Sequence, residues 1–180
     1  MNNKHSAFEG IKVLDLSTRL SGAWAARLFG DFGAEVLLPE TADGHFTRNC
    51  SPFFDVGGVN KSLLHEYVNW NKTSTCADEG HVAELISAAD IVVTTQPSDL
   101  IEHLDIQSIH LSITPHGLSG PWSAIGGNDL THSANSGWAM INKFEGEEPL
   151  QLPHNHPSFI SGVAGFIAAA AALFRRSREQ

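Results

Sequence analysis

The chain has 180 residues, 42% of them hydrophobic and 17% charged, so it can bury one ordinary core and is not a disordered chain. Its formal net charge of −9 argues against a nucleic-acid backbone or an anionic membrane as a partner. The first ten residues contain no apolar stretch of the kind found in signal sequences, and the two cysteines, Cys50 and Cys76, sit in no metal-spaced motif. We therefore expect a cytoplasmic α/β protein with reduced thiols.

The stretch from Phe8 to Glu40 predicts a strand, a helix and a second strand. Residues 11–16 are a short apolar run rich in strand formers, residues 23–29 contain helix formers, and residues 35–38 form a second apolar run. Two strands joined by a helix in about 30 residues form one βαβ unit, which predicts a parallel sheet. Ligands bind at the carboxyl ends of such strands, so residues 17–22 lie at the expected ligand edge.

The later part of the chain alternates predicted strands with predicted helices. Residues 46–68 show no regular pattern, because proline and glycines interrupt them, and are expected to form a functional segment or a surface excursion. The remaining predicted elements are strands at 73–76, 90–95 and 108–114 and helices at 80–89, from Pro97 through Leu104, and from Asn128 or Asp129 to about Ile141, with Gly137 weakening the last.

The last predicted element is a long apolar helix. It starts at Pro157 or Ser158, and residues 159–174 contain no charge. These residues are fewer than the roughly 20 needed to span a bilayer, so we expect a buried packing helix and no membrane partner. Three arginines follow between residues 175 and 178, where they suit the negative end of a helix.

Six pieces of the sequence occur in a specific order. They are FEGIKVLDLS at 8–17, SGAWAARLFGDFGAEV at 21–36, NKTS at 71–74, AADIVV at 88–93, HGLSGPWSAIGGNDL at 116–130 and SGVAGFIAAAAALFRRSREQ at 161–180. Together they resemble the N-terminal part of family III CoA-transferases, the group that includes formyl-CoA transferase, carnitine CoA-transferase and α-methylacyl-CoA racemase.

This resemblance implies a Rossmann-like parallel sheet flanked by helices and ending in the long apolar helix. Residues 1–180 would then be the N-terminal part of the family's large domain, with the second, smaller domain absent. The resemblance also implies coenzyme A bound at the strand ends of the first βαβ unit. Full-length family members are two chains interlocked as rings, so we expect a homo-oligomer or pairing with another family copy.

Family III transferases use an aspartate as the nucleophile that attacks the acyl-CoA thioester. That aspartate opens the helix whose early turn ends in a Thr/Ser-Gly pair, here Ser161-Gly162, so its place falls on Ser158. Serine cannot form the acyl anhydride, and its hydroxyl would need a nearby base, so the simpler interpretation of Ser158 is a helix cap. No aspartate occurs after Asp129. The resemblance therefore implies transfer of CoA between an acyl-CoA and a carboxylic acid, and the serine predicts that this chain alone is inactive.

The resemblance also implies which residues contact CoA. The backbone of Thr18, Arg19 and Leu20 would meet the adenine end, and Lys72 matches a family lysine near the nucleotide. Elsewhere the family presents an arginine after the second strand's glutamate, an Asn-Phe pair after the third clear strand and an arginine in the next helix. The residues here are Thr41, Thr95-Gln96 and His103. Because charge-assisted contacts to phosphate are the strong ones, we expect weakened or lost CoA binding.

Other functions have less support in the sequence. Asn128 stands where the racemase branch needs a histidine, so racemase chemistry is disfavoured. His154 and His156 form an H-x-H pair, but no Cys or carboxylate lies at a diagnostic spacing, so loop histidines rather than a metal site are expected. No G-x-G-x-x-G follows the first strand, so a plain nucleotide-binding module is weakly supported. Two hypotheses remain open: a CoA-transferase or a fragment of one, and a non-catalytic scaffold or partner domain of an active family copy.

Overall fold

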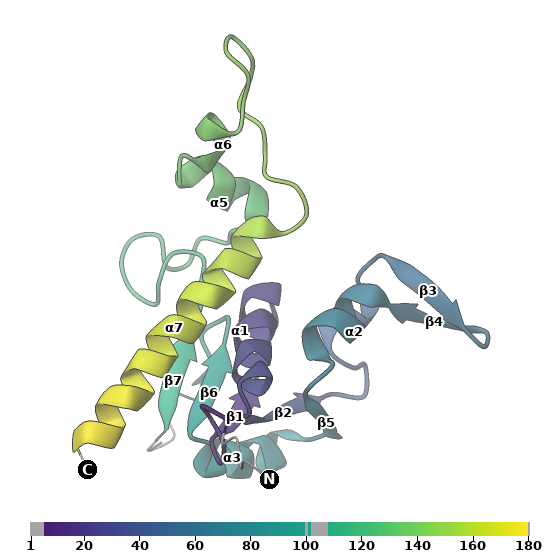
Figure 1. The fold of residues 1–180 in the computed structure, drawn as a ribbon, viewed down its shortest axis with the longest axis vertical. Helices are drawn as coiled ribbons and strands as arrows, with labels where there is room; N and C mark the ends of the chain where they lie inside the picture. Colours follow the sequence, from purple (N-terminus) through teal and green to yellow (C-terminus); the bar gives the residue numbers. More distant parts are fainter. Residues whose placement is uncertain (1–5, 100, 102–107, 180) are drawn as a thin grey trace.

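A five-stranded parallel sheet lies at the centre of the protein, in a computed structural model that describes residues 6–99, 101 and 108–179 (Figure 1). The strand order is β5-β2-β1-β6-β7, and every neighbouring pair is parallel. The strands are β1 (Lys12–Asp15), β2 (Glu35–Glu40), β5 (Thr73–Cys76), β6 (Ile91–Thr94) and β7 (Ile109–Ser112). The predicted α/β fold, a parallel sheet flanked by helices, is confirmed.

Helices cover both faces of this sheet. On one face lie α1 (Leu20–Asp31) and the C-terminal helix α7 (His156–Glu179), and α3 (Glu79–Ala88) lies on the other. Side chains alternate between the two faces along each strand, so Val13 packs in the cluster under α1 and α7 while the next residue, Leu14, packs with residues of α3. Alternation buries both faces of the central strands, as expected for a parallel sheet.

The segment that the sequence left irregular contains regular structure. It forms a 3-10 turn η1 (Phe46–Asn49), an antiparallel hairpin of β3 (Phe53–Val56) and β4 (Val59–Ser62), and helix α2 (Leu63–Asn69). Gly57 and Gly58 make the hairpin turn with φ of 63° and 85°, a combination that favours glycine. Figure 1 shows the hairpin projecting away from the sheet on the side opposite α7.

The helix predicted from residue 128 or 129 to about Ile141 is two helices, α5 (Asp129–Asn135) and α6 (Trp138–Ile141). Gly137 separates them in a left-handed conformation with φ of 77°. The Asn128 side chain and Thr131 form a reciprocal capping box that fixes where α5 begins. The helix predicted from Pro97 through Leu104 lies largely outside the described residues.

Helix α7 is a packing helix on one face only. Gly162, Gly165 and Ala169 are buried, and a Cβ atom at Gly162 would lie 2.6 Å from the backbone oxygen of Ser21 in α1. The opposite face is exposed and apolar, with Ile167 59% exposed. At 24 residues and a mean hydropathy of 1.8, the helix is also long and apolar enough to cross a membrane by length and composition alone, and 28% of its apolar stretch is buried in the protein. The prediction of a buried helix is therefore wrong for the outer face, because nothing in the described chain packs there.

Candidate functional site

A cleft of about 540 Å³ opens at the carboxyl ends of the central strands. Its walls are residues 18–21 at the entry to α1, residues 113–115 after β7, residues 128–130 at the start of α5, and Ser158 and Ser161 in the first turns of α7. Most of the segment that the sequence assigns to the ligand edge thus lines this cleft. In open parallel sheets, this edge is where ligands bind.

The turn into α1 is held by the residues that follow β6. The backbone N–H of Thr18 donates to Thr95 Oγ1 at 2.8 Å, and the Thr18 hydroxyl lies 3.3 Å from Gln96 Oε1. Gly22 completes the fit, because a Cβ there would come within 2.6 Å of Thr95 Cγ2 and closer still to Ser17. Thr95 and Gln96, which stand where the resemblance expects Asn-Phe, therefore fix the shape of the turn that carries Thr18, Arg19 and Leu20.

Arg19 joins two walls of the cleft. Its Nη1 donates to the backbone oxygen of Gly127 at 2.7 Å. This hydrogen bond connects the turn that enters α1 with the loop that precedes α5. The side chain is exposed, and a guanidinium has five N–H donors, so this contact leaves most of its donors available for a ligand. Among the described residues lining the cleft, it is the only lysine or arginine. Arg19 is thus the group best suited to meet an anionic ligand there.

Ser158 makes a contact that the sequence did not predict. Because α7 begins at His156, Ser158 lies inside the first turn rather than at the cap position, and its Oγ donates to Asp129 Oδ1 at 2.7 Å. Asp129 is the only carboxylate among the described residues that line the cleft. The two residues are 29 positions apart, and no local pattern connects them.

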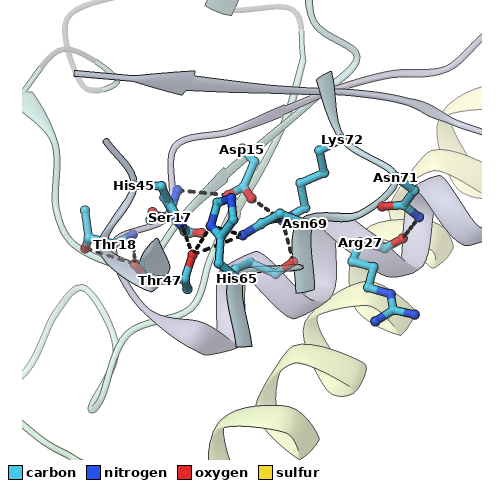
Figure 2. Close-up of polar contacts among 12 residues, drawn as sticks. Asp15, Ser17, Thr18, Arg27, His45, Thr47, His65, Asn69, Asn71 and Lys72 are labelled. Atoms are coloured by element: carbon cyan, nitrogen blue, oxygen red, sulfur yellow. Dashed lines mark hydrogen bonds and ion pairs between the residues drawn. The ribbon is translucent and has the colours of Figure 1, made fainter. Parts of the chain in front are cut away.

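Lys72 is not part of the cleft lining, and Figure 2 shows its side chain beside Asp15 and Asn69. Its side chain is 1% exposed, and its Nζ donates to Asp15 Oδ2, to the Ala23 backbone oxygen and to Asn69 Oδ1, each at 2.7 Å. The Ala23 and Asn69 oxygens can only accept, and Asp15 also accepts when it is ionised, so a charged ammonium satisfies all three contacts. The structure gives Lys72 a structural ion pair, and its predicted contact with CoA stays a prediction.

The environment of Asp15 favours its ionised form. Burial raises the pKa of this fully buried carboxyl, but the Lys72 ammonium and the Ser17 N–H lower it more, so the net pKa lies below its usual value. Burial also lowers the pKa of Lys72 and so favours a neutral amine. We take the pair as ionised, because a charged ammonium satisfies all three hydrogen bonds of Nζ.

A chain of hydrogen bonds continues from this pair into η1 and α2. His45 Nε2 lies 3.1 Å from the Ser17 carbonyl oxygen, which can only accept, so Nε2 carries a proton. Burial lowers the pKa of His45, so its ring is neutral and Nδ1 accepts from the Thr47 hydroxyl at 2.7 Å. The Thr47 oxygen then accepts from Asn69 Nδ2 at 3.0 Å. His65 Nδ1 lies 2.7 Å from the Thr47 hydroxyl oxygen and 3.1 Å from Asn69 Nδ2, so it closes the cluster.

Glu40, at the end of β2, is held by an arginine from a different element. Arg48 of η1 donates from Nε and Nη2 to the two carboxylate oxygens at 2.6 Å each, and Ser74 also donates to this carboxylate. These contacts lower the pKa of Glu40 to about 2, against the effect of burial. Thr41, where the resemblance expects an arginine, is exposed. A guanidinium is therefore present beside Glu40, although it comes from residue 48.

Three further predicted positions lie elsewhere. His154 and His156 are exposed, and within residues 6–99, 101 and 108–179 no group of three or more His, Cys, Asp or Glu side chains could hold a metal ion. His103 lies outside the described residues.

Comparisons with known proteins identify the family of this chain. The sequence profile of CoA-transferase family III matches residues 8–180. Succinyl-CoA:(R)-benzylsuccinate CoA-transferase subunit BbsE of Thauera aromatica is 29% identical over 188 residues, covering 95% of this chain and 46% of that protein. Succinyl-CoA:glutarate CoA-transferase of Mus musculus is 32% identical over 188 residues, covering 94% of this chain and 42% of that protein.

The fold of a solved structure matches as well. A CAIB/BAIF family protein from Brucella suis superposes with a TM-score of 0.88 at 26% identity, covering 98% of this chain and 51% of that one. The chain spans about half the length of the curated relatives it matches. Because the family profile covers almost the whole sequence, the chain belongs to CoA-transferase family III.

Proposed function

We propose that this protein binds coenzyme A or its thioesters in the cleft, as part of the transfer of CoA between an acyl-CoA and a carboxylic acid. The observation that carries the proposal is the position of the cleft, at the carboxyl edge of the sheet between the turn into α1 and the first turns of α7. The curated relatives, named as succinyl-CoA-dependent CoA-transferases, support the same reaction class.

Within the cleft, we assign the anionic part of the ligand to Arg19. It is the single lysine or arginine of the described lining, and its contact with the Gly127 oxygen leaves other N–H donors available for phosphate. The backbone of Thr18 is less available, since its N–H already donates to Thr95. One cation is a weak anchor for a ligand with several phosphate charges, so we expect a dissociation constant well above the micromolar range.

Titration calorimetry with CoA tests this proposal. We expect saturable, weak binding that Arg19→Ala reduces roughly tenfold, because a charge-assisted hydrogen bond contributes about 1.5–3 kcal/mol. Arg175→Ala is the matched control, since Arg175 is exposed near the far end of α7 and pairs with Glu179. Absence of any CoA binding, or an equal effect of both substitutions, would contradict the assignment.

We further propose that the 180-residue chain alone does not complete CoA transfer. The resemblance puts the family's aspartate at the position of Ser158, and the chain spans about half the length of the relatives. Incubation of the purified chain with an acyl-CoA and free carboxylic acids, followed by chromatography of the thioesters, should show no new acyl-CoA. Formation of a second acyl-CoA at a rate proportional to protein would refute this statement.

A second candidate function is that of a non-catalytic partner of an active family copy. Two observations favour it: the serine at position 158, and the exposed apolar face of α7, on which Ile160, Ile167 and Phe174 are 44–64% exposed. One relative is itself named as a subunit of a CoA-transferase. Light scattering should then show a dimer, with itself or with a coexpressed family III protein, and a monomer in both experiments would count against this function.

A further inference from the structure

The cleft contains a carboxylate at the place where the family's nucleophile would act. Ser158 occupies the position at which the resemblance puts the nucleophilic aspartate, and the Asp129 carboxylate lies 2.7 Å from the Ser158 hydroxyl. The two side chains come from different helices, α5 and α7. A carboxylate from α5 therefore reaches to within one hydrogen bond of the vacated position.

The Asp129 carboxylate is held in a defined position. Its Oδ1 accepts the hydrogen bond from Ser158, and its own backbone oxygen accepts from Ser133 Oγ at 2.7 Å. The capping box between Asn128 and Thr131 fixes the backbone on both sides of it. Among the described residues the structure gives Oδ2 no hydrogen bond, and Asp129 is partly exposed in the cleft lining. One oxygen is thus anchored while the other is open to the ligand.

We propose that Asp129 is the carboxylate nucleophile of this protein and that Ser158 is its positioning residue. The proposal rests on the proposed function, because it requires a CoA thioester in the cleft. In the first step, Asp129 Oδ2 attacks the thioester carbonyl carbon. A C–O bond forms, the C–S bond breaks, and the electron pair leaves with sulfur as CoA thiolate. The product is a mixed anhydride between Asp129 and the acyl group.

The second step also balances without an added reactant. The released thiolate attacks the Asp129 side-chain carbonyl carbon, the C–O bond of the anhydride breaks, and the acyl group leaves as its free carboxylate. This leaves an aspartyl-CoA thioester on residue 129. No proton is transferred in either step. The Ser158 hydroxyl donates its hydrogen bond to Oδ1 throughout, which keeps the carboxylate turned toward the cleft.

Direct attack by Ser158 is the competing chemistry, and the geometry favours it less. Its hydroxyl would have to lose a proton to the Asp129 carboxylate, which is a weak base for an alcohol. Among the described residues of the cleft lining, His132 is the one histidine, and within the described chain no hydrogen bond joins it to Ser158. An ester on Ser158 and a thioester on Asp129 are chemically distinct products, so one experiment separates them.

The experiment traps the enzyme-bound intermediate. The purified protein is incubated with excess succinyl-CoA or acetyl-CoA and then treated with hydroxylamine, which converts an aspartyl thioester to a hydroxamate that peptide mass spectrometry can locate. We expect the hydroxamate on Asp129 and its loss in Asp129→Asn. Asp43→Asn, an exposed aspartate outside the cleft lining, is the control and should be labelled like the unchanged protein.

Two variants at Ser158 test the positioning role. Ser158→Ala should reduce labelling roughly tenfold or more, since small displacements of a reacting group are costly, and Ser158→Thr, which keeps the hydroxyl, should restore most of it. Calorimetry on Ser158→Ala should still show saturable CoA binding, which separates a loss of the reaction from a loss of the ligand. An equal loss of labelling in both variants would remove Ser158 from the proposal.

The outcomes separate this inference from the proposed function. CoA binding without a hydroxamate on Asp129 would overturn the assignment of Asp129 and leave the binding proposal intact. Acylation of Ser158 would identify serine as the nucleophile and overturn the inference. No CoA binding in the unchanged protein would overturn both.

Discussion

Replacing Lys72 by methionine tests the buried ion pair that supports the cleft. The substitution keeps the length and apolar stem of the side chain but removes the ammonium that balances Asp15, whose side chain is fully buried. Removing one partner of a buried pair costs about 3–5 kcal/mol, because the remaining charge has no compensation. The Ala23 and Asn69 oxygens lose their hydrogen bonds as well. We therefore expect Lys72→Met to lose about 4 kcal/mol, a large part of the roughly 5–15 kcal/mol that a domain has in total.

The assay is urea unfolding followed by circular dichroism, with Asp15→Asn/Lys72→Met as the matched variant. The double substitution removes both charges and should be more stable than Lys72→Met by about 2 kcal/mol. In Lys72→Met, burial remains the largest effect on Asp15 while the lowering by Lys72 is lost, so we expect the folded-state pKa of Asp15 to rise above the unfolded value. A raised pKa means that the penalty is largest at neutral pH and diminishes as the pH falls through that value. A loss below about 1 kcal/mol, or a difference from the unchanged protein that grows on acidification, would refute this reasoning.

Three further predictions concern packing and pH. Gly162→Ala should lower the melting temperature measured by calorimetry, although alanine favours helices, because its Cβ would lie 2.6 Å from the Ser21 backbone oxygen; a rise would contradict the packing of α7 on α1. Burial lowers the pKa of His65 from 6.5 to about 4, so on acidification the unfolded chain binds this proton before the folded chain does. The free energy of unfolding should therefore fall by up to about 3 kcal/mol between pH 6.5 and 4. Urea unfolding at the two pH values measures this fall, and coincident curves would contradict it. Arg48 lowers the pKa of Glu40 to about 2, so Arg48→Met should raise that pKa toward 4.5 in a carbon-detected NMR titration and move the acid loss of stability to higher pH; an unchanged titration would show that Arg48 does not hold the carboxylate.

The strands and main helices could be predicted because their signals are local. Apolar runs at 11–16, 35–38 and 90–95 lie within one or two residues of β1, β2 and β6. The hairpin β3–β4 was missed, since its strands contain exposed and polar residues and lack a clean alternation. The break at Gly137 needed a backbone conformation, φ of 77°, that composition can permit but does not dictate.

The edge that carries the cleft was predictable, but the partners of its side chains were not. A βαβ unit makes its two strands parallel, and parallel strands place their carboxyl ends at the same edge of the sheet. The contact of Lys72 with Asp15 spans 57 residues, and that of Ser158 with Asp129 spans 29. Lys72 lies between α2 and β5, and Ser158 lies in the first turn of α7, so both contacts depend on how these elements pack in the folded domain. A resemblance assigns a residue to a position, and only the folded chain shows which neighbour reaches that position.

The order in which the cleft walls occur along the chain has a consequence for synthesis on the ribosome. The turn at residues 18–21 emerges first, the segments at 113–115 and 128–130 follow, and the wall at Ser158 and Ser161 emerges last of the four. The sheet from β5 to β7 is complete by Ser112, well before that wall exists. Since domains are translated from the N-terminus at about 5–20 residues per second, a nascent chain passes several seconds with its sheet synthesised and its binding edge still open. Because part of the cleft is formed by α7, a ligand of the complete cleft can bind and stabilise only chains in which α7 has already packed against the sheet.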